Sequence, residues 1–104
     1  MKLKFLPIVT AVLALAGTAA QANPEEAMNK AGCMACHSKD KKLVGPSFKD
    51  IAAKYKGQDV AAKLFDKVRK GGSGSFGPVP MAPNPAEKIN DADLKAAIGV
   101  ILKS

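Results

Sequence analysis

Large side chains and metal-binding side chains are both scarce in this sequence. Its 104 residues include no Trp, one Tyr, four Phe, two Cys and one His. Two cysteines are too few for a scaffold built on several disulfides. Two Cys and one His also leave a structural zinc site short of its four ligands. Only one long apolar run is present, which excludes a membrane protein with several spans.

What is present indicates one folded domain that depends on something besides its own side chains. Apolar residues make up 47% of the sequence, too many for a disordered chain. The length suits a single domain. A domain this small, with so few large side chains, has difficulty building a stable core unaided. We therefore expect a metal, a cofactor or a partner to complete it.

The N-terminus has the pattern of a signal peptide. Two lysines precede an apolar stretch over residues 5–16, and the tripeptide Ala-Gln-Ala at 20–22 fits a cleavage site before Asn23. The alternative is an uncleaved membrane anchor, but the apolar run is shorter than the roughly 20 residues that a spanning helix needs. We predict that residues 1–22 are a cleaved signal peptide, that residues 23–104 form the exported domain, and that no stable membrane insertion remains.

Both cysteines and the only histidine stand together as Cys33-Met34-Ala35-Cys36-His37. A redox-active dithiol of the thioredoxin kind requires a preceding strand, and no strand pattern precedes this motif. A surface disulfide beside an incidental His is the second interpretation. Covalent attachment of c-type haem requires only Cys-x-x-Cys-His: two thiols add to the vinyl groups of one ring, and the adjacent His supplies the proximal imidazole. The motif therefore favours haem.

The remainder reads as short helices without any alternating strand pattern or internal repeat. Capping residues and helical apolar spacing predict four of them. The first is capped by Asn23 and ends at Gly32, the second is capped by Ser47 and ends at Gly57, the third is capped by Asp59 and ends before Gly71, and the last is capped by Asn90.

Residues 71–89 form a connection too long for an ordinary loop in a small domain. The segment is rich in Gly, Ser and Pro but keeps Phe76, Val79 and Met81 among them. Glycine allows close approach of the backbone, and proline stiffens it in extended form. We expect this segment to lie against a flat apolar surface, for which a haem face is the obvious candidate.

The sixth ligand of such a haem iron has several candidates. A second His is excluded, which leaves Met28, Met34, Met81, a Lys amine or an open site. The first two methionines lie too near the attachment motif to reach the opposite haem face. Met81 is far along the chain in a stiff proline-rich setting, which favours it over the ordinary role of Met as a core filler. His/Met ligation raises the reduction potential and leaves no site for substrate, which favours electron transfer over catalysis.

Four segments resemble the small bacterial class I cytochromes c of the c-551/c-552 type. They are residues 33–37, 44–46, 49–55 and 77–84, and the likeness covers essentially all of the exported domain in order. The resemblance implies an all-α class I cytochrome c fold, with about four short helices around one covalently bound haem c. It also implies a soluble, monomeric carrier in the periplasm that moves single electrons and is not an enzyme.

The resemblance also implies roles for individual residues. Carried over by position, Cys33 and Cys36 attach the haem, and His37 and Met81 are its axial ligands. The carbonyl of Pro46 would accept a hydrogen bond from His37 Nδ1–H, which orients the ring and makes it a better donor.

Further roles, and two departures, concern residues around the haem. In the family an Asn at the position of Asn84 orients the methionine sulfur, and a basic residue at the position of Lys67, with Arg69 nearby, meets a haem propionate. Many relatives carry Trp where this chain has Phe76, which has no N–H to donate. Many also carry Trp at Val100, whose smaller side chain removes aromatic bulk.

Partners of an electron carrier are larger redox proteins, here with a nitrite reductase or a terminal oxidase as candidates. Cleavage before Asn23 would remove two of the 16 Lys and Arg residues and none of the nine acids, so the exported domain keeps a net charge of +5, which would steer encounters with acidic surfaces. Nucleic acid is not expected. Two alternative functions keep the haem: a peroxidase or a gas sensor of the cytochrome c′ kind. A copper or thiol redox protein would require that no haem be present.

Overall fold

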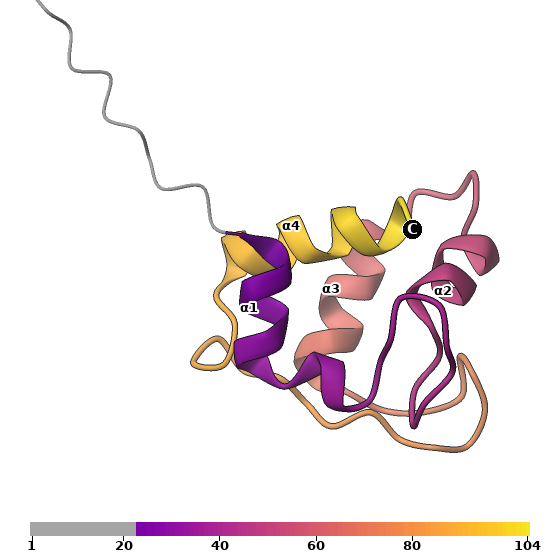
Figure 1. Ribbon diagram of the computed structural model, residues 1–104, viewed down its shortest axis with the longest axis horizontal. Helices are drawn as coiled ribbons and strands as arrows, with labels where there is room; N and C mark the ends of the chain where they lie inside the picture. The colour runs from indigo at the N-terminus through magenta and orange to yellow at the C-terminus, as the bar shows by residue number, and fades with distance from the viewer. Residues whose placement is uncertain (1–22) are drawn as a thin grey trace, which may run out of the picture.

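The computed structural model describes residues 23–104, and these form helices without a strand. The elements are α1 (Pro24–Ala31), the 3-10 helix η1 (Cys33–Ala35), α2 (Phe48–Lys54), α3 (Ala61–Lys70) and α4 (Asp91–Leu102) (Figure 1). This confirms the predicted all-α fold class. The predicted signal peptide, residues 1–22, lies outside the described residues. Within residues 23–104, no helix has both the length and the apolar character needed to cross a membrane.

Three of the four predicted capping residues begin their helices as expected. The side chain of Asn23 accepts a hydrogen bond from Glu25 N at 3.1 Å, and Ser47 Oγ accepts one from Asp50 N at 3.1 Å. Asn90 Oδ1 accepts a hydrogen bond from Asp93 N at 2.8 Å. Each bond satisfies a backbone N–H that the first helical turn leaves without a partner.

The predicted cap of the third helix was wrong. Asp59 does not cap α3; the residue at the N-cap is Val60, and no side chain makes a capping hydrogen bond there. Val60 is buried, with 7% of its surface exposed. The start of α3 therefore coincides with the burial of an apolar side chain, which a local capping pattern does not reveal.

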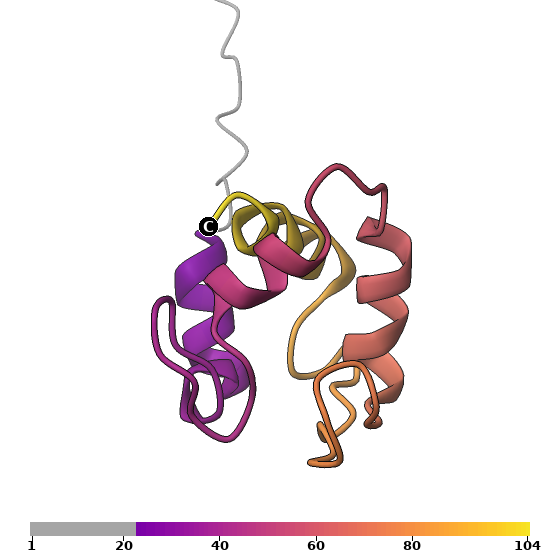
Figure 2. The same ribbon diagram turned by 90° about the vertical axis from the view of Figure 1, so that its right-hand side faces the viewer.

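The helices are arranged around α4. Helices α1, α2 and α3 each pack against α4, and none of the three packs against another. Figure 2 shows α1 and α2 on one side and α3 on the other, with α4 across the top. The buried core is correspondingly small and gathers under α4; it consists of Met28, Ala31, Phe48, Ile89, Leu94, Ala97 and Ile98.

Arg69, in α3, binds the segment that connects α3 to α4 and the first residue of α4. Its Nη1 donates to Asn84 O at 3.1 Å and Ile89 O at 2.7 Å, and its Nη2 pairs with Asp91 Oδ1 at 2.7 Å. The guanidinium also lies 5.0 Å from the Phe65 ring centroid. Only 16% of the Arg69 side chain is exposed. The segment before α4 is therefore tied to α3 by one side chain.

Replacing Arg69 is expected to destabilise the domain. In Arg69→Gln, the carbonyls of Asn84 and Ile89 lose a charged donor, which predicts a loss of about 2–3 kcal/mol in the free energy of unfolding. Denaturant unfolding measures it. The neighbouring exposed Lys70→Gln is the matched control and is expected to stay within about 0.5 kcal/mol of the parent. Equal effects of the two substitutions would show that stability depends only on the charge of α3 and not on the hydrogen bonds of Arg69.

Candidate haem-binding site

A cavity of about 720 Å³ lies beneath α4, in the space that α1, α2 and α3 leave between them. Its volume is within the roughly 300–1,000 Å³ typical of cofactor and ligand pockets. All four helices and the 71–89 segment contribute to its walls. It is lined by every predicted site residue, namely Cys33, Cys36, His37, Pro46, Lys67, Met81 and Asn84.

The cysteine motif forms a tight turn at one wall of this cavity. Gly32 ends α1 with a φ of 83°, and η1 begins at Cys33. Within the turn, Cys36 N and His37 N both donate to Cys33 O, at 3.2 and 3.0 Å. This turn brings two thiols and one imidazole to the same wall.

Both thiols are free, and they differ in exposure. Cys33 is half-buried and Cys36 is exposed. Burial raises the pKa of the Cys33 thiol and outweighs a backbone hydrogen bond and the positive charge of Lys88, which both lower it. Cys33 is therefore held mainly as the thiol at neutral pH.

His37 is oriented by a backbone carbonyl. Its Nδ1 lies 2.7 Å from Pro46 O, and because a carbonyl only accepts, Nδ1 carries the proton. Nε2 then keeps the lone pair that a metal requires. The ring also stacks on Phe48, with centroids 5.7 Å apart. Both the tautomer and the plane of the imidazole are therefore set by contacts within the protein.

Gly45 gives the imidazole its space. A Cβ atom at this position would lie 2.6 Å from His37 Cε1 and 2.9 Å from Nδ1. Gly45 N also donates to Cys36 O at 2.7 Å, so the backbone is held in place. A side chain at position 45 would have to displace the ring.

Gly45→Ala is accordingly expected to lower stability by about 1–3 kcal/mol, as overpacking does. It is also expected to weaken the low-spin visible spectrum of the haem-loaded protein. Gly99→Ala in α4 is the matched control, because no atom lies within 4 Å of a Cβ there; it should raise stability by up to about 1 kcal/mol. An unchanged spectrum in Gly45→Ala would contradict the role assigned to the glycine.

Met81 is held by the backbone on both sides. Gly72 and Met81 exchange two hydrogen bonds of 2.9 Å each. A Cβ at Gly71, which has a φ of 69°, would collide with Met81 O. Three residues further on, Asn84 N donates to Val68 O at 2.9 Å. The segment that carries the thioether is therefore fixed to the end of α3.

The other two predicted residues line the cavity but use their polar groups for the backbone. Asn84 is buried, and its Nδ2 donates to Ala82 O at 3.0 Å. Lys67 Nζ lies 3.5 Å from Ser73 O. Contacts of Asn84 with the Met81 sulfur, and of Lys67 with a propionate, stay predictions. Arg69, the alternative to Lys67, is occupied by the loop carbonyls and Asp91.

Phe76, the position at which the resemblance implies Trp in many relatives, is anchored by Lys54, for which the sequence predicted no role. Lys54 Nζ lies 4.4 Å from the Phe76 ring centroid and donates to Ser75 O. The edge of the ring meets Tyr55 at a centroid distance of 6.3 Å. A cation–π contact and an aromatic pair thus hold this part of the loop. The lysine and its partners are far apart in the sequence, and no local signal connects them.

The residues present fit a c-type haem. A flat apolar ring needs apolar walls, and the cavity is lined by side chains such as Met28, Phe48, Leu64, Val68 and Ile101. Two thiols, one imidazole with a free Nε2 and one thioether line the same cavity. This donor set matches covalent attachment through two cysteines with nitrogen and sulfur ligands to iron.

Comparison with known proteins agrees with this geometry. A family model described as Cytochrome c matches residues 21–101. The chain is 51% identical over 84 residues to cytochrome c2 of Rubrivivax gelatinosus, covering 80% of this chain and 99% of that protein. It is 44% identical to cytochrome c-552 of Nitrosomonas europaea, covering 98% and 97% of the two chains. The crystal structure of wild-type Nitrosomonas europaea cytochrome c552 superposes with a TM-score of 0.68 at 44% identity, over 76% of this chain and 96% of that one.

Proposed function

The chain belongs to the cytochrome c family, and from this premise we propose that it is a periplasmic carrier of single electrons between larger respiratory redox proteins, with its haem iron held between His37 and Met81. The coarser part of this statement follows from the family: its members are electron carriers and bind one covalently attached haem c. The ligands, the compartment, the partners and a monomeric state are the proposal.

One observation carries the proposal: all four groups that haem attachment and axial ligation require line one cavity. Cys33 and Cys36 would form the thioethers, and His37 Nε2 and the Met81 sulfur would bind the iron. When bound, the haem supplies a one-electron iron couple. With His37 and Met81 both bound to the iron, no position would remain for a substrate, which favours electron transfer over catalysis.

The surroundings of both ligands favour rapid electron transfer. His37 is fixed by Pro46 O and the Phe48 ring, and Met81 by its two bonds to Gly72. Ligands held in this way move little when the charge on the iron changes. The neutral thioether of Met81 favours ferrous iron and raises the reduction potential.

Apolar side chains at the cavity mouth give a partner a surface for contact. Val44, Phe76 and Val79 line the cavity and are 56%, 38% and 58% exposed. Exposed apolar side chains around a cavity are a common feature of interaction surfaces. Exposed lysines near the attachment motif, namely Lys30, Lys39, Lys41 and Lys42, add positive charge that steers acidic partners.

The visible spectrum of the mature protein, with carbon monoxide added to the reduced form, tests the proposal. We expect a low-spin c-type spectrum, a far-red sulfur-to-ferric-iron band and no response to carbon monoxide at neutral pH. A high-spin spectrum that shifts with carbon monoxide would remove Met81 from the iron and favour a sensor or peroxidase. Fractionation of the native host, with mass analysis of the mature N-terminus, tests export and cleavage before Asn23.

A further inference from the structure

One wall of the large cavity is a turn with little structure of its own. Residues 74–77 form this turn, which is closed by a hydrogen bond of 2.9 Å from Gly74 N to Gly77 O and lines the cavity along its whole length. Gly74 and Gly77 have φ angles of 106° and 102°, a region that other residues rarely adopt. No backbone hydrogen bond joins residues 73–79 to any other part of residues 23–104. Side-chain contacts therefore hold the turn against the helices.

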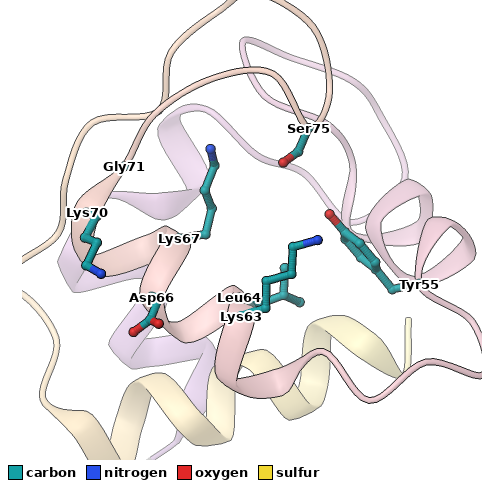
Figure 3. A pocket seen from close by; sticks show the side chains of 8 residues that line it. All are labelled: Tyr55, Lys63, Leu64, Asp66, Lys67, Lys70, Gly71 and Ser75. Carbon is teal, nitrogen blue, oxygen red and sulfur yellow. The ribbon is translucent and has the colours of Figure 1, made fainter.

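Lys54, at the end of α2, supplies most of these contacts. Its Nζ donates a hydrogen bond to Ser75 O and lies 4.4 Å from the centroid of the Phe76 ring. The same Nζ lies 5.7 Å from the ring centroid of Tyr55, whose ring meets Phe76 edge-on. Figure 3 shows Ser75 and Tyr55 facing each other across this junction between the turn and α2. One ammonium group thus contacts a carbonyl and a ring of the turn and a ring of the helix.

The other side chains near the turn hold it less well. Lys67 Nζ lies 3.5 Å from Ser73 O, which is the outer limit for a hydrogen bond, and the resemblance assigns this lysine to a carboxylate of the cofactor. The side chain of Phe76 has no polar group with which to bind the helices. Lys54 itself does not line the cavity, so it can act on the cofactor only through the turn.

We propose that Lys54 is a positioning residue that holds the 74–77 turn against α2, closes this wall of the cofactor cavity to water and so keeps the reduction potential high. The proposal rests on the proposed one-electron function but not on the identity of the distal ligand. The apolar shell around a metal controls solvent access and local dielectric, and a drier site favours the ferrous iron, which is the less positive form. Phe76 provides the apolar wall, and Lys54 keeps it in place.

Amide hydrogen exchange in the mature, haem-loaded protein, followed by nuclear magnetic resonance, tests whether Lys54 holds the turn. In Lys54→Gln, the Gly74 amide is expected to exchange about tenfold faster, because a cation–π contact and a charged hydrogen bond are lost. The amides of Gly72 and Met81, which bond to each other at the base of the segment, should keep their rates within about twofold. Equal acceleration throughout α4 would show a general loss of stability and would overturn the proposal.

Lys63→Gln is the matched control for charge. Lys63 Nζ also lies 5.7 Å from the Tyr55 ring centroid, but it makes no hydrogen bond or cation–π contact with the turn. Lys63→Gln should therefore leave the exchange of Gly74 within about twofold of the parent. Lys54→Arg keeps the charge, the donors and the cation–π contact, and it should restore slow exchange. A turn that opens as much in Lys63→Gln as in Lys54→Gln would overturn the proposal.

A double-mutant cycle tests the contact between Lys54 and the ring. Phe76→Leu removes the aromatic face and keeps apolar bulk at the wall. If the ammonium group acts on this ring, Lys54→Gln should accelerate Gly74 exchange less in the Phe76→Leu background than in the parent. Accelerations that simply multiply in the double variant would overturn the role of this contact.

A redox titration tests the consequence for the cofactor. Both Lys54→Gln and Lys63→Gln remove one positive charge beside the same ring, but only the first opens the wall, so its reduction potential should fall further. An equal fall in the two variants would contradict the link between the wall and the potential and would leave the electron-carrier function intact. Absence of the far-red band in the parent protein would contradict the proposed Met81 ligand, whereas the exchange rate of Gly74 would still test Lys54. The two proposals therefore fail in distinguishable ways.

Discussion

Met81→Ala is expected to abolish the far-red sulfur-to-iron band and to let the reduced haem bind carbon monoxide. If Met81 is the proposed ligand, held in place by its two bonds to Gly72, removal of its thioether leaves one coordination position of the iron open. The reduction potential is expected to fall, since the neutral sulfur ligand favours ferrous iron. Visible spectroscopy with and without carbon monoxide, together with a redox titration, measures all three effects.

Two other methionines supply matched controls for this substitution. Met34 is 38% exposed and does not line the cavity, so Met34→Ala should change neither spectrum nor stability. Met28 lines the cavity and is only 4% exposed. Met28→Ala should cost about 2–5 kcal/mol of stability through lost packing but keep the band. A Met28→Ala protein that loses the band while Met81→Ala keeps it would reassign the ligand.

The double variant Cys33→Ala/Cys36→Ala is expected to accumulate as an unfolded or molten chain without covalent haem. A core in a chain of about this length rarely contributes more than about 3–5 kcal/mol. Without the haem, the apolar side chains that line its cavity would be exposed to water and lose their burial. The cavity here measures about 720 Å³. Far-ultraviolet circular dichroism should show most helical signal lost, and denaturing gels stained for haem should show none.

Variants that lack only one cysteine are expected to show a smaller loss of haem. Cys36→Ala leaves Cys33 for one thioether, and Cys33→Ala leaves Cys36, so each should retain some haem at reduced yield. A double variant that keeps the full helical signal without haem would show that the helices need no cofactor to fold. That result would contradict the view that the haem completes the core.

Local patterns in the sequence predicted the parts of the fold that depend on neighbouring residues. The caps at Asn23, Ser47 and Asn90 were confirmed because a capping bond spans only two or three residues. The failure at Asp59 has the opposite cause: the start of α3 coincides with the burial of Val60, a tertiary contact.

At the candidate haem-binding site, the resemblance to the family predicted more than local sequence patterns did. The bond between His37 and Pro46, nine residues apart, was expected from the family and is present at 2.7 Å. Spacing alone does not reveal such a bond, since the loop between the two residues has no regular period. The orienting role of Asn84 stays a prediction: its Nδ2 donates to Ala82 O at 3.0 Å, and the amide nitrogen has a second hydrogen to donate.

The sequence by itself determined the chemistry of the site, through the motif of two thiols and one imidazole and the scarcity of other ligands. Its helical patterns also determined the fold class. Only the tertiary structure decided how the rest of the chain serves the site. It placed Met81 through Gly72, tied Asn84 to Arg69, and set Lys63 and Lys67 beside Tyr55. The physical reason is range. Covalent motifs and caps act over a few residues, whereas cavities, clamps and charge clusters arise from side chains that meet only when the chain folds.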